Sequence, residues 1–309
     1  MRAKDARETR FGILAYPGAQ EAAVLGLRDL LCAAADASPT PPVSVQVVRP
    51  DDLPARSFTA VVLPPSLGGA PPGPPDPALG TWIRARHDAG TTVCSVCVGA
   101  FVLAELGLLD RRPATTHWAL ASTFRERFPR VRLEVDRMVV DDGDIVTAGG
   151  VMAWVDLGLA LVARFLGPTV ALAVSRLFLV DPGGRVQSLY ASFSPVLNHG
   201  DAPILAVQHW LQGRIDKPVS VEAMAARADL PRRTFLRRFQ RATGLRTRAY
   251  LQALRIHRAR ELLESSNLGM DELAWQVGYE DAGSLRRVFV DHLGTTPLDY
   301  RRRFGIVHR

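Results

Sequence analysis

The chain has 309 residues, of which 47% are hydrophobic and 22% charged, so it can form two globular domains, each with its own core. Its net charge of +7 is unevenly placed: residues 204–309 hold 19 Lys/Arg against 11 Asp/Glu, whereas residues 1–203 hold 19 against 20. The composition argues against a disordered chain and directs the search for a polyanionic partner to the last third.

The first half of the chain predicts strands and helices in alternation. The expected strands are short β-branched runs, at residues 11–16, 43–48, 60–65, 91–96, 137–141 and 144–148. The expected helices are longer amphipathic stretches, at residues 20–37, 78–89, 99–106, 117–128 and 151–165. Residues 64–77 are rich in Pro and Gly and are interpreted as a loop. This order predicts a flavodoxin-like α/β domain at residues 10–190, a mostly parallel sheet with helices on both faces.

Beyond a linker at residues 191–203, the pattern changes to helices alone, which predicts an all-α domain at residues 204–305. Its expected helices are residues 204–211, 221–228, 232–242, 247–264, 271–277 and 282–292. Ser220 is placed to cap the second of these helices, and Asp229 begins a tight turn into the third.

No apolar run approaches the roughly 20 residues of a membrane span, so we expect a cytoplasmic protein without a membrane partner. The three cysteines, Cys32, Cys94 and Cys97, form no disulfide framework, in agreement with a reducing compartment. We expect neither a metal site nor a cofactor. Cys94 and Cys97 spell C-x-x-C, but residues three apart on a strand are too distant for a disulfide, and we discard a redox role.

The segment Leu230–Gly244 carries five arginines in a predicted helix. Phe235 and Phe239 share one face of that helix, and a row of arginines shares another, so one face is expected to pack and the other to be presented. Residues 284–294 repeat the pattern 50 positions later. A single arginine-rich helix is usually a solvated face, but two copies joined by one long helix favour a pair of helix-turn-helix units.

Residues 204–304 resemble the AraC/XylS family of transcriptional regulators. The matching positions are Arg255, Ile256, Ala259, Leu262, Leu263, Val277, Gly278, Tyr279, Phe289, Gly294, Thr295, Thr296, Pro297, Tyr300 and Arg301. The resemblance implies that two units enter successive major grooves of double-stranded promoter DNA. It assigns base contacts to Arg232, Arg233, Leu236 and Arg237 in the first unit and to Ser284, Arg286 and Arg287 in the second.

Two details qualify this assignment. Arg238 and Arg241 are expected to contact phosphate or solvent, while Phe235, Phe239, Leu285 and Phe289 belong to the core. Gly283 departs from a good helix start, because glycine lowers helix propensity by roughly 1 kcal/mol relative to alanine.

In the first domain, Cys97 lies where a buried strand runs into a helix, and Gly99 is expected to allow the sharp turn. A thiol at a helix N-terminus ionises easily, and His117 is the candidate base. Residues 10–185 resemble the PfpI, or class I glutamine-amidotransferase-like, superfamily, with Cys97 as the elbow cysteine and His117 as the family histidine. Together with the second domain, this combination is similar to the two-domain regulators of the GlxA type.

Two departures from the enzymes of that superfamily argue against catalysis. The position of their acidic residue is Ala23, with Glu21 two residues out of register, and their Gly-Gly pair is replaced by Pro65-Ser66. We therefore expect a regulator that is not an enzyme, with Cys97 and His117 as vestigial catalytic candidates. The predicted pocket lies at the C-terminal ends of the strands, with candidate residues Cys97, Val98, His117 and Ser66.

The leading hypothesis is a sequence-specific DNA-binding regulator that is modulated by a small-molecule effector and forms a homodimer. A contact with RNA polymerase is a further partner consistent with it. One alternative is a cysteine-dependent hydrolase, hydratase or glyoxalase-like enzyme with a helical appendage. Another is a regulator that has no ligand and works through dimerisation alone.

Overall fold

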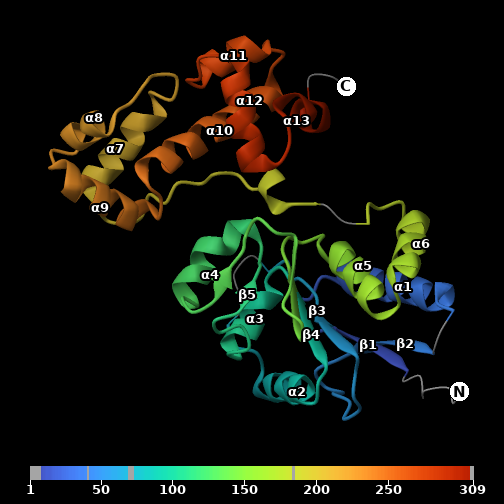
Figure 1. Cartoon of the computed structure of the whole chain (residues 1–309). Helices are drawn as coiled ribbons and strands as arrows, with labels where there is room; N and C mark the ends of the chain where they lie inside the picture. Colours follow the sequence, from blue (N-terminus) through green and yellow to red (C-terminus); the bar gives the residue numbers. More distant parts are fainter. Residues whose placement is uncertain (1–7, 40–41, 69–72, 183–184, 307–309) are drawn as a thin grey trace, which may run out of the picture. The chain divides into compact units, whose positions relative to one another are not determined.

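The computed structural model describes residues 8–39, 42–68, 73–182 and 185–306, so part of the loop predicted at 64–77 lies outside the described residues. The chain divides into two compact units, Met1–Ala191 and Ser192–Arg309 (Figure 1), and each is described by itself.

The first unit is built on a six-stranded sheet with strand order β2-β1-β3-β4-β8-β7. Its strands are β1 (Thr9–Leu14), β2 (Val43–Val48), β3 (Ala60–Leu63), β4 (Thr92–Val96), β7 (Val139–Asp141) and β8 (Ile145–Ala148). All neighbours pair in parallel except β7 and β8, which are antiparallel. The central strands β3, β4 and β8 are buried along their whole length, as parallel strands covered on both faces must be.

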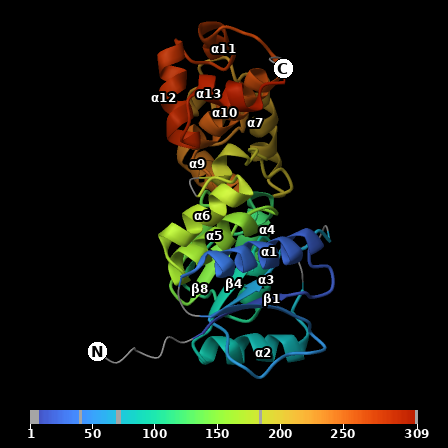
Figure 2. The same ribbon diagram turned by 90° about the vertical axis from the view of Figure 1, so that its right-hand side faces the viewer.

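Helices cover both faces of this sheet (Figures 1 and 2), which confirms the predicted α/β fold class. On one face α1 (Glu21–Ala37), α5 (Trp154–Phe165) and α6 (Pro168–Phe178) pack against one another. On the other face lie α2 (Pro77–Asp88), α3 (Gly99–Glu105) and α4 (Ala121–Arg127). Strand β3 serves both layers, because Ala60 and Val62 join the first core whereas Val61 and Leu63 join the second.

Three features of this unit were not predicted. Helix α6 follows α5 after only Leu166 and Gly167; the predicted helix ends at residue 165, as α5 does, but no helix was expected at residues 168–178. The strands β5 (Pro113–Ala114) and β6 (Arg132–Leu133) form a separate parallel pair, and two residues are too few to show a period. The helix predicted at 117–128 begins as a 3-10 turn at Trp118–Leu120 before α4.

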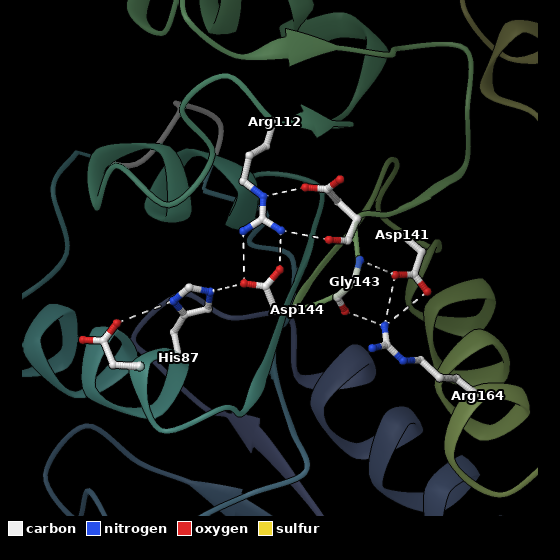
Figure 3. A network of polar contacts seen from close by, with 8 residues as sticks. His87, Arg112, Asp141, Gly143, Asp144 and Arg164 are labelled. Atoms are coloured by element: carbon white, nitrogen blue, oxygen red, sulfur yellow. Dashed lines mark hydrogen bonds and ion pairs between the residues drawn. The ribbon is translucent and has the colours of Figure 1, made fainter.

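A polar network fixes the turn between β7 and β8 (Figure 3). Arg112 bonds to the carboxylates of Asp142 and Asp144, and His87 Nε2 lies 2.7 Å from Asp144 Oδ2. Arg164 of α5 donates to Asp141 Oδ1 at 3.0 Å. These contacts lie at the end of the sheet where β8 begins, opposite the end where Cys97 follows β4, so they stabilise the scaffold.

The second unit is all-α, as predicted. Its helices are α7 (Ala202–Gln212), α8 (Val221–Arg227), α9 (Arg232–Thr243), α10 (Thr247–Ser265), α11 (Met270–Gln276), α12 (Ala282–Leu293) and α13 (Pro297–Phe304). Ser220 caps α8 as expected, since its hydroxyl accepts the Ala223 N–H at 3.1 Å. Helix α13 was not singled out by the sequence.

Candidate functional site

The pair α8 and α9 forms a helix-turn-helix unit around an aromatic core. Phe235 and Phe239 are fully buried, and Phe239 meets Tyr250 of α10 edge to face with ring centroids 5.2 Å apart. Asp229 makes the tight turn between the two helices in a left-handed conformation, with φ of +51°. The buried phenylalanines confirm their predicted role as core residues.

The pair α11 and α12 repeats this arrangement. Phe289 packs on Tyr300 of α13 with ring centroids 5.5 Å apart, and both residues lie 50 positions after Phe239 and Tyr250. Gly278 occupies the left-handed turn position, with φ of +79°. Helix α12 forms in spite of Gly283, because Asp281 Oδ1 caps its first turn by accepting the Ser284 N–H at 2.6 Å.

The proposed base-contacting residues lie in the first two turns of α9 and in the first turn and a half of α12. Those that are exposed are Arg232, Arg233, Arg237, Arg286 and Arg287. Leu236 is half-buried against the core of its unit, and Arg232 Nε lies 3.3 Å from Glu222 of α8. Ser284 is half-buried, and its hydroxyl donates to Asp281 Oδ2 at 3.3 Å.

Arg238, which the sequence assigned to phosphate or solvent, forms an ion pair in the structure, and its side chain is 28% exposed. Its Nε donates to Asp201 Oδ2 at 2.9 Å and its Nη2 to Asp201 Oδ1 at 2.7 Å. The Asp201 side chain is only 9% exposed and also caps α7. Arg238 therefore fastens α9 to α7, whereas Arg241, three residues later, is exposed.

Arg255, on the long helix α10, connects the two helix-turn-helix units. Its Nε donates to Ile215 O at 3.0 Å and its Nη2 to Lys217 O at 2.9 Å, in the connection that leads into α8. Its guanidinium also lies over the ring of Tyr279, 5.5 Å from the centroid, in the turn of the second unit. Gly278 passes so close that a Cβ there would meet both Ile215 O and the Arg255 guanidinium.

In the α/β unit, Met1–Ala191, Cys97 lies at the elbow between β4 and α3. Its own φ is +56°, so the cysteine makes the sharp turn that was expected of Gly99. Gly99 serves a different purpose, because a Cβ there would lie 3.0 Å from Leu63 O. Burial raises the pKa of Cys97 to about 11, and the nearby backbone amides of Val98 and Gly150 lower it only in part. The expectation of an easily ionised thiol was therefore wrong.

The candidate base for Cys97, His117, forms its hydrogen bond elsewhere. Ala23 is fully buried, and Glu21 is exposed in the first turn of α1. His117 Nδ1 accepts the Ala119 N–H at 3.1 Å, and burial lowers the pKa of the imidazole. Tyr16 donates its hydroxyl to Pro64 O at 2.5 Å. Among the described residues, no carboxylate or imidazole forms a hydrogen bond with the Cys97 thiol.

A cavity of about 340 Å³ opens beside the elbow. Its walls are the 3-10 turn after His117, the loop after β8, and the segment that follows α6: His117, Trp118, Met138, Gly149, Gly150, Val151, Met152, Ala153, Arg185, Gln187 and Tyr190. Of the four predicted pocket residues, His117 lines this cavity. Cys97 and Val98 are buried and do not line it, although the backbone amide of Gly150 in its wall bonds to Cys97. Ser66 is half-buried in the loop after β3.

The cavity residues that the sequence did not suggest are Arg185, Gln187 and Tyr190. They come from a stretch that was interpreted as the approach to a linker, where Gly, Pro and Ser obscure any periodic pattern. A lone arginine in such a stretch carries no signal of its own. Within the described residues there is no group of three or more His, Cys, Asp or Glu suited to a metal ion, and no helix long and apolar enough to cross a membrane.

Comparison with known proteins matches both units. The helix-turn-helix domain family matches residues 224–303, and the DJ-1/PfpI family matches residues 36–164. The HTH-type transcriptional regulator GlxA of Rhizobium meliloti (strain 1021) is 31% identical over 233 residues, which cover 73% of this chain and 69% of GlxA. The chain belongs to the family of GlxA-like HTH-type transcriptional regulators. It is accordingly a DNA-binding regulator with an AraC-type domain and a DJ-1/PfpI domain.

Two further matches concern single domains of this GlxA-like regulator. Isonitrile hydratase of Pseudomonas putida is 31% identical over 179 residues, which cover 52% of this chain and 74% of that enzyme. The crystal structure of the DNA-binding domain of AdpA in complex with a target DNA is 36% identical and covers 33% of this chain and 92% of that one, with a TM-score of 0.32.

Proposed function

We propose that the regulator reads promoter DNA with both helix-turn-helix units. The first helix-turn-helix unit would use Arg232, Arg233, Leu236 and Arg237. The second helix-turn-helix unit would use Ser284, Arg286 and Arg287. The observation that carries this proposal is that α9 and α12 each expose arginines on the face opposite their buried phenylalanines. An arginine presented in this way can bond to O6 and N7 of guanine, and its neighbours can hold phosphates.

The adjacent residues Arg237 and Arg238 provide the test. Duplexes would first be selected by the wild-type protein from a random-sequence pool. Arg237→Ala is expected to cost about 1 to 3 kcal/mol in specific binding and to relax the preference at one base pair. Arg238→Ala should lower the melting temperature, since it breaks the pair with Asp201, but leave the base preference unchanged. An unaltered base preference in Arg237→Ala would refute the assignment.

We further propose that the DJ-1/PfpI unit binds a small-molecule effector, pairs with a second copy of the chain and does not catalyse a reaction. The cytoplasm is the proposed location, and RNA polymerase is a proposed partner at the promoter. The cavity beside His117 supports an effector site, since its volume is at the lower end for ligand pockets. The raised pKa of Cys97 and the burial of Ala23 at the acid's position support the absence of catalysis.

A cysteine-dependent enzyme is the second candidate, favoured by the left-handed elbow at Cys97 and by the likeness to isonitrile hydratase. Assaying the full chain for isonitrile hydration tests the hydratase form of this candidate. We expect no turnover above that of Cys97→Ser. Turnover that Cys97→Ser abolishes would establish the enzyme.

A further inference from the structure

One wall of the cavity beside His117 is formed by the last residues of the α/β unit. Arg185, Gln187 and Tyr190 all line it, and the unit ends at Ala191. The hydrogen-bonding groups of these side chains that have no protein partner determine which ligands the cavity can bind.

Gln187 is a buried structural residue. Its Nε2 donates to Thr115 Oγ1 and Thr116 O at 3.0 Å and to Arg137 O at 3.1 Å, while its Oε1 accepts the Trp118 N–H at 3.1 Å. The side chain is 2% exposed, and a Cβ on Gly149 would collide with it. Gln187 thus ties the segment after α6 to the strand and turn opposite. Both of its amide hydrogens are used, and one lone pair of the buried Oε1 is all that is left.

His117 offers a hydrogen-bond donor. Its Nδ1 is occupied as the acceptor of the Ala119 N–H. The neutral ring therefore carries its proton on Nε2, which can donate to a ligand.

Arg185 offers further donors. Its Nε donates to Asp156 Oδ1 at 2.9 Å, and its Nη2 bonds to Asp156 Oδ2 and to Met152 O. Among the described residues, Nη1 has no hydrogen-bond partner. The Asp156 carboxylate is 8% exposed and is already paired with Arg185. The hydrogen-bonding groups of Arg185 and His117 that have no partner are therefore donors.

The rest of the wall is largely apolar and is formed by Trp118, Met138, Val151, Met152 and Ala153. We propose that this cavity binds a small carboxylic acid, whose carboxylate accepts hydrogen bonds from Arg185 and His117 and whose apolar body contacts Trp118 and Met138. The proposal rests on the effector role proposed for this unit. Because Arg185 belongs to the segment that leads into the DNA-binding unit, a bound acid adds contacts to that segment and so can affect the DNA-binding unit.

The test uses the purified full chain and matched pairs of probes: phenylacetate with phenylacetamide, 3-phenylpropionate with its primary amide, and isovalerate with isovaleramide. Binding is measured by calorimetry and by the shift in melting temperature. At least one acid should bind, and its amide should bind at least tenfold more weakly. Hydrogen exchange of residues 185–191 should slow when that acid binds, while exchange of residues 141–144 stays the same.

Paired substitutions identify the site. In the double variant Arg185→Gln/Asp156→Asn both charges are removed together, so no uncompensated buried carboxylate remains to unfold the unit. It should bind the acid at least tenfold more weakly. The matched control Arg164→Gln/Asp141→Asn removes another Arg–Asp pair that also involves α5, and it should bind the acid as the wild type does.

The proposal is overturned if none of the acids binds, if acid and amide bind equally, or if the Arg185/Asp156 variant retains full affinity. DNA affinity is measured separately, with and without the acid. A bound acid that leaves DNA affinity unchanged supports the site but refutes the effector role. Absence of acid binding with sequence-specific DNA binding intact refutes the ligand class and leaves the DNA-binding function standing.

Discussion

Replacing Arg255 by alanine should weaken the link between the two helix-turn-helix units. The substitution removes two hydrogen bonds from a charged donor to the carbonyls of Ile215 and Lys217, each worth about 1.5 to 3 kcal/mol in favourable cases. It also removes a contact with the Tyr279 ring worth about 0.5 to 1 kcal/mol. Because Arg255 is half-buried, water replaces part of this, and we expect a loss of roughly 2 to 4 kcal/mol.

The assay combines stability with DNA geometry. Denaturant unfolding measures the lost free energy. Arg258→Ala is the control, since Arg258 lies on the same helix and pairs with Glu261 three residues later. Binding is then compared on duplexes whose two half-sites are separated by one to three additional base pairs. The wild type should lose affinity steeply as the spacing departs from one helical turn, roughly 34 Å. Arg255→Ala should lose affinity less steeply, because its units are less firmly joined.

Two results would refute the reasoning. One is an Arg255→Ala protein that unfolds at the same denaturant concentration as Arg258→Ala. The other is an unchanged dependence on half-site spacing. Arg255→Lys refines the interpretation, because lysine keeps the charge but not the planar fork, and we expect it to restore only part of both properties.

Three further predictions concern single positions. The rate of alkylation of Cys97 by iodoacetamide should keep rising with pH beyond 9. A pKa of about 11 leaves roughly 100-fold less thiolate at pH 8 than an ordinary pKa near 9 would. A rate that reaches a plateau below pH 9, measured by mass spectrometry over time, would contradict this. Gly278→Ala should cost about 2 kcal/mol or more in denaturant unfolding, because a Cβ there meets Ile215 O and the Arg255 guanidinium. Asp229→Gly at the equivalent turn should change stability by no more than about 1 kcal/mol. Equal effects of the two substitutions would contradict this difference between the turns. Asp144→Asn should lower the melting temperature at pH 7, since hydrogen bonding to Arg112 holds the pKa of Asp144 well below its usual range. Its contribution is present above the unfolded-state pKa of about 3.9 and disappears as the pH falls through the lower folded-state pKa, so the two melting curves should converge in acid.

Most secondary structure could be predicted because its signals are local. The β-branched runs became β1, β2, β3 and β4, and the caps and turn residues near Ser220 and Asp229 set the limits of α8 and α9. Periodicity failed where strands had only two residues, because a period needs several residues to become visible. Helix α6 is a different case, since its 11 residues are enough to show a period, yet they were not assigned to a helix.

The candidate site was predictable only in part, because its chemistry depends on contacts between distant residues. The motif around Cys97 suggested a reactive thiol, yet burial raises the pKa of that thiol. The cavity depends on Arg185, which no motif distinguishes and which acquires its role through Asp156, 29 residues earlier.

The sequence by itself determined that an α/β domain precedes two basic helix-turn-helix units, because periodicity, turn residues and motif spacing are properties of neighbouring residues. The tertiary structure alone decided which arginines are available. Arg237 and Arg238 are adjacent and chemically identical, but Arg238 meets Asp201, 37 positions away, and Arg237 remains exposed. Only the folding of α7 against α9 brings that carboxylate within reach, so no local pattern could have separated the two residues.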